Sequence, residues 1–426
     1  MKPTHETRKL AEIVFDEALY PRREHDPAIV QRYASSIESI EAAGKYISLT
    51  HDNRILDGKH RFLGYRVASQ DDQERSVPVF VYPEMPEHDA FALAVELNSQ
   101  HGYQLLERDK KQSAVKLYGF GFSYKTISGM VSVSERELTA WLSDTVKQEK
   151  ERKDEMILDM HFSCHTQAEI AKATGLAQPT IKEKIDTLSE RYQGSNSIKL
   201  TFSDEEFETP IYNVWTQNAK SNAVGHFGNT EQRWVENLLY AYTEPFDIVV
   251  DPFAGGGATI DVCKKRGRRY FVSDRLPIIA REDEIRKWDI GDGLPELPQW
   301  KDVKLVYLDP PYWKQAENQY SSDPEDLANM PLEKFNEALS GLIKAFAKKL
   351  KAGSFIALII QPTQWNAPDR QFTDHVGDML RAVKLPVDMR ISCPYSTQQC
   401  TAQMVDWAKE NRRCLVLSRE IIVWRI

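Results

Sequence analysis

Two short motifs in the C-terminal half combine residue types that could carry out chemistry. The first is Asp309-Pro310-Pro311-Tyr312, which directly follows the apolar run 304–308. Prolines restrict the backbone, so the Asp309 carboxylate and the Pro310 carbonyl become fixed hydrogen-bond acceptors at the end of a predicted buried strand. Tyr312 adds a flat aromatic face. Two aligned acceptors beside an aromatic ring suit a planar exocyclic amine, such as the amine of a nucleobase.

The second motif is a glycine-rich turn, Asp251-Pro-Phe253-Ala254-Gly255-Gly-Gly257, which follows the apolar run 248–250. Glycines let a backbone approach a ligand closely, and ligands bind at the carboxyl ends of strands in doubly wound sheets. A second predicted strand ends near Asp274, about 20 residues past the turn, where a carboxylate can accept hydrogen bonds from ribose hydroxyls. The sequence therefore predicts a cofactor pocket and an amine-binding corner in one domain.

The glycine turn followed by Asp309-Pro-Pro-Tyr312 resembles the amino-group (N6-adenine or N4-cytosine) DNA methyltransferases over roughly residues 205–426. The resemblance implies S-adenosylmethionine as the cofactor. It places this cofactor in the turn, with Asp274 on the ribose and Asp251 facing the amino group. An acidic residue contacts the adenine; we favour Asp289, and Asp292 stays open. The segment containing Phe227 and Thr230, with the helix 234–242, resembles the element that touches the methionine end.

The Asp309-Pro310-Pro311-Tyr312 motif, called the Asp309 corner below, predicts direct attack of the amine on the methyl group of the cofactor. An exocyclic amine is a poor nucleophile because its lone pair is delocalised into the ring. Acceptance of its protons by Asp309 and the Pro310 carbonyl would move the nitrogen toward tetrahedral geometry. Asp at position 309 favours adenine N6, and cytosine N4 stays open. Methylation at C5 of cytosine is disfavoured because neither Cys393 nor Cys400 lies in a Pro-Cys-Gln setting.

From residue 200 to residue 426, apolar runs alternate with helical patterns, which predicts an α/β domain with a parallel, helix-flanked sheet. The resemblance implies a Rossmann-like, seven-stranded methyltransferase sheet, and we expect residues 413–418 and 420–424 to form its closing antiparallel pair. Within this domain, the basic run 264–269 predicts either a phosphate contact or a solvated helix end. Segments 313–330 and 361–399 are candidates for recognising the target.

Residues 104–195 are predicted to be helical, with two helix-turn-helix units. The clearer unit begins with a capping box from Thr166 to Glu169, and its second helix leaves Gln178, Thr180 and Lys182 pointing outward. A helix in this position can enter the major groove of DNA. Acidic and basic residues balance over this segment, so weak or partner-assisted DNA binding is as consistent with it as strong binding. Helical pairs of this kind also serve as plain packing modules. Residues 193–197 are predicted to be a linker.

In residues 1–103, the run Gly58-Lys59-His60-Arg61 predicts a tight turn and a basic helix start, which can bind an anion. With Pro21-Arg22-Arg23 and 98–102, it resembles the ParB/sulfiredoxin-like α+β fold, which together with the helix-turn-helix units covers roughly residues 8–190. Lys59 replaces the sulfiredoxin cysteine, which excludes that chemistry, and the missing glutamate of Gly-Glu-Arg-Arg puts nucleotide hydrolysis in doubt. We interpret this segment as a phosphate-recognising or DNA-positioning module, with a scaffold as the alternative.

Composition sets the limits of these interpretations. The 426 residues carry 55 Lys+Arg and 63 Asp+Glu, a net charge of −8, which excludes a cationic field over the whole chain. No run approaches the ~20 apolar residues of a membrane helix, and the scattered cysteines suit a reducing cytoplasm. We therefore expect no membrane association. We also expect no metal site, because His161, Cys164 and His165 lack a fourth ligand.

Three domains are therefore predicted, at residues 1–103, 104–195 and 200–426. The expected function is a site-specific DNA amino-methyltransferase that acts on double-stranded DNA and flips its target base. The sequence leaves a homodimer open. Two other functions also stay open, namely a ParB-like DNA-binding regulator with a secondary methyltransferase domain, and an RNA methyltransferase.

Overall fold

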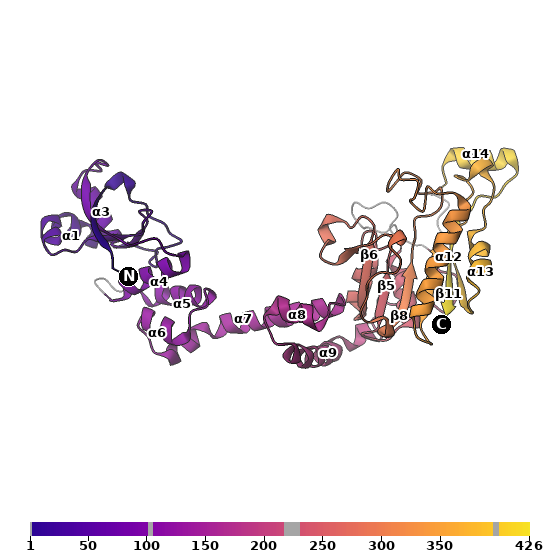
Figure 1. Cartoon of the computed structure of the whole chain (residues 1–426), viewed down its shortest axis with the longest axis horizontal. Helices are drawn as coiled ribbons and strands as arrows, with labels where there is room; N and C mark the ends of the chain where they lie inside the picture. Colours follow the sequence, from indigo (N-terminus) through magenta and orange to yellow (C-terminus); the bar gives the residue numbers. More distant parts are fainter. Residues whose placement is uncertain (1, 101–104, 217–230, 395–399) are drawn as a thin grey trace. The chain divides into compact units, whose positions relative to one another are not determined.

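The computed structural model describes residues 2–100, 105–216, 231–394 and 400–426. The chain forms two units, residues 1–152 and 153–426 (Figure 1). Helix α7 (Glu135–Phe162) begins in the first unit and ends in the second. The division into three domains remains a prediction.

The first unit opens with a four-stranded sheet in the order β1-β4-β2-β3. Strand β2 is parallel to β4, whereas β1 pairs with β4 and β3 with β2 in antiparallel fashion. The strands are β1 (Thr4–Lys9), β2 (Ile47–Leu49), β3 (Ile55–Asp57) and β4 (Ser76–Val81). The helices of this part are α1 (Pro27–Ala34), α2 (Ile37–Ala42) and α3 (Lys59–Ala68).

Helices complete the first unit, as the sequence predicted. They are α4 (Glu87–Gln100), α5 (Glu107–Gly119), α6 (Tyr124–Val131) and the first part of α7. Leu117, Ile127, Leu138 and Leu142 from these helices are fully buried in one core. The first predicted helix-turn-helix unit is thus formed by α6 and the start of α7.

The second predicted helix-turn-helix unit is formed by α8 (Gln167–Thr174) and α9 (Gln178–Leu200). The capping box is present, because Thr166 accepts from the Glu169 amide while the Glu169 side chain accepts from the Thr166 amide. Gly175 ends α8 in the left-handed region at φ 71°. Gln178, Thr180 and Lys182 are exposed, and Ile170, Ile181 and Ile185 are buried in a small core.

The predicted linker at 193–197 is wrong, because these residues lie inside α9, which is kinked at Asn196. The end of α9 is held against α11 (Ala258–Arg266). Arg266 donates to the Lys199 carbonyl at 2.8 Å and Arg268 to the Leu200 carbonyl at 2.8 Å. Contacts at the end of α9, where Leu200 is buried, therefore hold residues 193–197 in the helix although most of them are exposed and turn-like in composition.

The same contacts determine which side chains of the basic run 264–269 are buried. Arg266 is fully buried and pairs with Asp204 and with Glu236, the latter at 2.6 Å, while Arg268 donates to the hydroxyl and carbonyl oxygens of Thr243. Lys264 pairs with Glu284 at 2.5 Å. Lys264 and Lys265 lie at the exposed end of α11, as the solvated-helix-end alternative predicted, whereas Arg266 and Arg268 are buried and face the protein.

Replacement of Arg266 by alanine should lower the free energy of unfolding by about 3–5 kcal/mol, because Asp204 and Glu236 would lose their buried partner. Lys265→Ala is the matched control. Lys265 also pairs with Glu236, but its side chain is 38% exposed, so its loss should cost less than about 1 kcal/mol. Urea unfolding followed by circular dichroism measures both; equal effects would contradict the buried role of Arg266.

The second unit is built on a seven-stranded sheet in the order β10-β11-β9-β8-β5-β6-β7. Strand β11 is antiparallel to its two neighbours, and the other strands run parallel to one another. The strands are β5 (Ile248–Asp251), β6 (Arg269–Asp274), β7 (Ile285–Lys287), β8 (Val303–Leu308), β9 (Phe355–Ile360), β10 (Val387–Pro394) and β11 (Ser418–Arg425). This sheet confirms the predicted Rossmann-like α/β fold.

Helices cover both faces of this sheet. Side chains alternate between two cores along each strand, with Val250 and Val306 in one core and Val249 and Leu305 in the other. Helices α12 (Leu332–Lys349) and α13 (His375–Val383) pack on the first face, and α10 (Gln232–Tyr242) and α11 on the second. Helix α14 (Ala402–Asn411) lies at the end of the sheet where β11 begins (Figure 1).

The closing antiparallel pair differs from the prediction. Residues 420–424 lie in β11 as expected, but its partner at the edge is β10, not residues 413–418. The run 413–417 has no regular structure and connects α14 to β11. Apolar composition alone did not distinguish this connection from a strand.

Among the described helices, none combines the length and apolar character that crossing a bilayer requires.

Candidate active site

The glycine turn lies between β5 and α11, as predicted. Gly257 caps α11 in the left-handed region at φ 84°. A Cβ atom at this position would lie 2.7 Å from Nη1 of Arg281, whose guanidinium also donates to the Gly257 carbonyl. The backbone conformation therefore favours glycine here, and any Cβ would in addition displace the Arg281 guanidinium.

Asp274, at the end of β6, holds this turn in place. Its carboxylate accepts from the Gly255 amide at 2.9 Å and from the Leu276 amide at 2.9 Å. The predicted ribose ligand and the glycine turn are therefore in direct contact. Each carboxylate oxygen retains a lone pair, so Asp274 can accept further hydrogen bonds from a ligand in the pocket.

Asp251 is buried at the end of β5. One carboxylate oxygen accepts from the Thr259 hydroxyl at 2.5 Å and the other from the Phe253 amide at 2.9 Å. Burial raises the pKa of Asp251 to about 7, although both hydrogen bonds lower the pKa. Thr259, in the first turn of α11, is a site residue that the sequence analysis missed.

Asp251 should make stability depend on pH. Its pKa in the folded protein lies above the ordinary value of 3.8, so this group stabilises the fold fully below about pH 4, and that contribution is lost as the pH rises through about 7. Asp251→Asn removes the titration. The melting temperature of the variant minus that of wild type should therefore increase from pH 5 to pH 8. The increase should be about 2–4 °C for each kcal/mol that wild type loses by ionising the buried Asp251 carboxylate.

Calorimetric scans of both proteins over this pH range measure the difference. Thr259→Val serves as the control, because it removes the hydroxyl but leaves the titrating carboxylate. Parallel pH profiles for wild type and Asp251→Asn would show that Asp251 stays ionised throughout the range.

The Asp309-Pro310-Pro311-Tyr312 corner follows β8 directly, as predicted. The Tyr312 hydroxyl donates to Oδ1 of Asp309 at 3.0 Å, and the Arg419 guanidinium lies 5.3 Å from the centre of the Tyr312 ring. Tyr312 is therefore both an aromatic wall and a hydrogen-bond partner of the acidic residue. The sequence analysis anticipated only the wall.

Residues after the corner hold it rigidly. The Tyr312 carbonyl accepts from the amides of Gln315 and Ala316, at 3.2 and 3.1 Å. Thr363, beyond β9, donates to the Trp313 carbonyl at 2.9 Å and accepts from the Gln315 side chain at 3.1 Å. The corner is thus connected to the neighbouring strand by buried hydrogen bonds.

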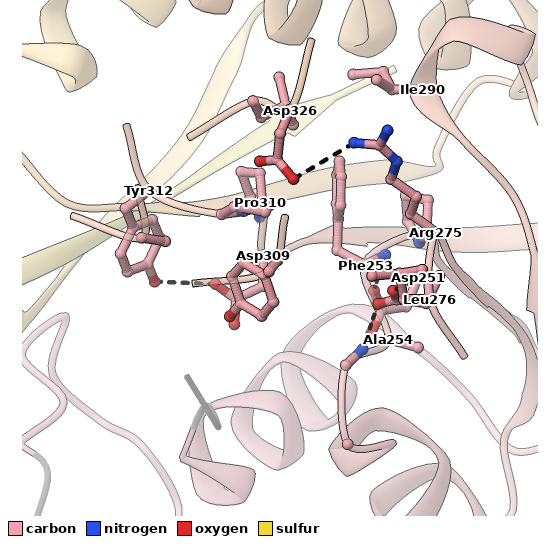
Figure 2. A pocket seen from close by; sticks show the side chains of 18 of the residues that line it. Asp251, Phe253, Ala254, Arg275, Leu276, Ile290, Asp309, Pro310, Tyr312 and Asp326 are labelled. Carbon is pink, nitrogen blue, oxygen red and sulfur yellow. Dashed lines mark hydrogen bonds and ion pairs between the residues drawn. The ribbon is translucent and has the colours of Figure 1, made fainter. Parts of the chain in front are cut away.

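The glycine turn and the acidic corner line a single pocket of about 340 Å³. Figure 2 shows Asp309, Pro310 and Tyr312 along one side of it, and Arg275, Leu276 and Ile290 along the other. The sheet produces this arrangement because β5 and β8 are adjacent parallel strands, so their carboxyl ends meet at one edge. The two motifs that the sequence singled out separately therefore open into the same cavity.

Arg275 is the principal pocket residue that sequence reasoning missed. It pairs with Asp289 at 2.9 Å, with Asp323 at 2.5 Å and with Asp326 at 3.5 Å, the last shown as a dashed line in Figure 2. These carboxylates come from the segments after β7 and β8. Asp289, the expected adenine ligand, lines the pocket, and Asp292 is not among its lining residues. Arg275 directly follows Asp274 in the sequence, and this position was the signal that could have identified it as a pocket residue.

Tyr320 adds a second aromatic ring to the pocket. Burial raises the pKa of its phenol to about 12, and the nearby carboxylates of Asp309 and Asp274 contribute to this rise. The neutral phenol is therefore the form present at physiological pH. Phe227 and Thr230, which the sequence analysis assigned to the cofactor site, lie outside the described residues.

The predicted anion site in the first unit is engaged in internal contacts. Arg61 pairs with Asp57 and donates to the Tyr46 carbonyl at 2.8 Å. The Lys59 ammonium lies 3.8 Å from the centre of the Phe15 ring, and His60 accepts from the Asp26 amide at 3.0 Å. Burial lowers the pKa of His60 to about 4, so it is neutral. Gly58 has φ 102°, as a tight turn requires.

Comparison with known proteins gives matches to parts of the chain. The family model described as DNA methylase, of the N6/N4 type, matches residues 108–279. This match includes the glycine turn and Asp274 and ends before the Asp309 corner. Over these residues it confirms the resemblance to the amino-group DNA methylases that the motifs predicted.

The curated relative "Type II methyltransferase M.XycI" from Xanthomonas campestris pv. cyanopsidis is 39% identical over 57 residues, which are 13% of this chain. The match spans 19% of that relative, about a fifth of its length.

Two solved structures also align. A truncated ParB from Caulobacter crescentus, complexed to the parS site, covers 45% of this chain and 92% of its own, at 13% identity and a TM-score of 0.25. A geranyl diphosphate methyltransferase in complex with SAM covers 46% and 85%, at 12% identity and a TM-score of 0.29.

Proposed function

We propose that the protein is a site-specific DNA methyltransferase that transfers a methyl group from S-adenosylmethionine to an exocyclic amine of a flipped base. The observation that carries this proposal is the single pocket lined by both the glycine turn and the Asp309 corner. A pocket shared by two such motifs allows a cofactor and a base to meet in one place.

The residues of the turn fit S-adenosylmethionine. The turn offers backbone rather than side chains to the ligand, and the Asp274 carboxylate beside it can accept hydrogen bonds from ribose hydroxyls. Asp289, Phe253 and Ile290 line the pocket near Arg275 and suit the adenine, while Asp251 is placed for the amino end. When bound, the cofactor supplies an electrophilic methyl group on a sulfonium.

The acidic corner would act on the base. Asp309 and the Pro310 carbonyl accept hydrogen bonds from the amine, which localises the nitrogen lone pair and makes it available for attack. The one proton that the nitrogen must lose on methylation would pass to the Asp309 carboxylate. Tyr312 supplies a stacking face worth about 1–3 kcal/mol, which offsets part of the few kcal/mol needed to extract a base from the duplex. The hydrogen bond from Tyr312 to Asp309 keeps the carboxylate oriented.

Adenine N6 is the acceptor we favour, because aspartate rather than serine stands at position 309. Cytosine N4 presents the same amine geometry and is the second candidate. Duplex DNA is favoured over RNA by the two helix-turn-helix units, whose outward residues Gln178, Thr180 and Lys182 are exposed. Residues 1–152 would then help to position the DNA. Arg61 of this unit is paired inside the protein, which suits a DNA-positioning role more than direct binding of a phosphate.

Long-read sequencing of DNA from cells that express the chain tests this proposal. The expected result is a modified adenine within a short recurring sequence. Purified protein should also transfer tritiated methyl groups from S-adenosylmethionine to duplex DNA. Modified cytosine N4 would select the second acceptor. Preference for RNA in a competition assay, or binding to DNA without methyl transfer, would overturn the proposal in favour of an RNA enzyme or a regulator.

A further inference from the structure

The connections that surround the pocket leave the sheet at one edge. Because β10 runs parallel to β9 and β8, its carboxyl end lies at the edge that carries the Asp309 corner, and β11 begins there. Helix α14 and residues 412–417 lead into β11 at this edge, at the opposite end of β11 from the C terminus (Figure 1). Residues 402–417, the described part of this connection from α14 to β11, therefore lie at the edge that holds the proposed active site.

Helix α14 contributes almost nothing to the core. None of its residues is buried. Its contacts with the body include a ring pair: Trp407 meets Trp365, from the segment after β9, at 5.8 Å between ring centres in an edge-to-face arrangement. Arg370 covers the same rings, 4.1 Å from Trp365 and 5.2 Å from Trp407. A helix that packs on the body through half-buried residues alone keeps its polar face free to meet a partner.

The end of α14 carries three exposed cations, Lys409, Arg412 and Arg413. In the described part of the chain they form no ion pair, unlike Lys264, Lys265 and Arg266 of the basic run. The exposed acidic residues of this helix are Asp406 and Glu410. Cations near a helix C terminus also complement the helix dipole.

We propose that Lys409, Arg412 and Arg413 form a phosphate-docking surface that holds duplex DNA over the active-site edge. The inference rests on the proposed function and names the surface that receives its substrate. A flipped base can reach the Asp309 corner only if the duplex lies across this edge of the sheet, and the backbone phosphates beside it then need cationic partners. The three cations of α14 meet that requirement with side chains that have no ionic partner inside the described chain.

Charge reversal of the three residues tests this surface. The variant K409E/R412E/R413E should raise the KM for unmethylated plasmid DNA about tenfold or more, since each phosphate that a cation neutralises adds a counterion-release contribution. The slope of log KM against log salt should become shallower by about 0.9 for each phosphate that is no longer neutralised. The affinity for S-adenosylmethionine and the turnover at saturating DNA should remain within about twofold of wild type, because no pocket residue has changed.

The matched control is K344E/K348E/K351E, which makes the same charge change at exposed lysines in the second half of α12 and in the turn before β9. An equal rise in KM for this control would overturn the inference and assign the effect to net charge. An unchanged KM in the α14 variant, at unchanged melting temperature, would also overturn it. If the variant is destabilised, K409Q/R412Q/R413Q repeats the measurement without added negative charge.

Direct binding separates this inference from the proposed function. Fluorescence polarisation with a labelled DNA duplex measures affinity without methyl transfer, and its salt dependence reports how many phosphates are neutralised. Weaker DNA binding by the α14 variant supports the surface even if wild type shows no methylation. Equal DNA binding by wild type and variant overturns the surface and leaves the proposed chemistry untouched. Tighter binding to an RNA duplex than to DNA would also overturn it.

Discussion

Asp309→Ala should reduce methyl transfer to duplex DNA by at least about 100-fold, and toward roughly 10,000-fold if Asp309 also removes the proton from the amine. Its carboxylate is one of two rigid acceptors at the end of β8, and the Tyr312 hydroxyl already bonds to it at 3.0 Å. Alanine leaves the target amine with the Pro310 carbonyl alone. The lone pair of the amine would then remain delocalised into the ring.

The measurement is tritiated methyl incorporation at saturating DNA, together with calorimetric titration of S-adenosylmethionine. Cofactor affinity should change less than about threefold, because Asp309 belongs to the corner after β8 and not to the glycine turn. The control is Asp302→Ala, which removes an exposed aspartate directly before β8, at the opposite end of the strand from Asp309. Retained activity in Asp309→Ala would refute the assigned role.

Asp274→Ala should weaken S-adenosylmethionine binding about 10- to 100-fold, since hydrogen bonds to a charged group contribute about 1.5–3 kcal/mol and each 1.4 kcal/mol is about tenfold in affinity. The carboxylate accepts from the Gly255 amide, and the proposed function assigns to it the ribose hydroxyls of the cofactor. The turn also loses the acceptor that fixes its conformation, so the loss should appear in cofactor binding before it appears in DNA binding.

Titration calorimetry with S-adenosylmethionine checks this effect, and DNA affinity measured without cofactor should stay within about twofold of wild type. The control is Asp283→Ala, an exposed aspartate between β6 and β7. It removes the same charge from the same region without touching the turn. A loss in Asp283→Ala as large as that in Asp274→Ala would mean that net charge, and not the turn, governs cofactor affinity.

Local patterns predicted much of this chain. The turn after β5, the carboxylate ending β6, the corner after β8 and the capping box of α8 all lie where the sequence indicated. Each depends on covalent or short-range effects: the freedom of glycine, the restriction of proline and the pairing of side chains with amides a few residues away. Such features are fixed by residues adjacent in sequence, and so they can be recognised there.

Other features depended on partners far along the chain. The basic run 264–269 had the composition of a surface patch, yet Arg266 and Arg268 are buried because Asp204, Glu236 and the end of α9 supply acceptors. Residues 193–197 continue a helix for the same reason. Arg61 had the setting of an anion ligand, but it donates to the Tyr46 carbonyl, 15 residues earlier in the chain, and only its second partner, Asp57, is close in sequence. No local rule reveals such long-range neighbours.

The sequence by itself determined the two motifs, the strand-to-turn context of each and the parallel sheet that carries them, since these follow from apolar periodicity and from the conformational limits of glycine and proline. Only the tertiary structure decided that the motifs share one pocket, that Arg275 joins three carboxylates across it, and that α14 presents its exposed cations at the same edge. The physical reason is strand order: placing β5 beside β8 and β10 beside β11 sets distances between residues that sequence separation does not encode.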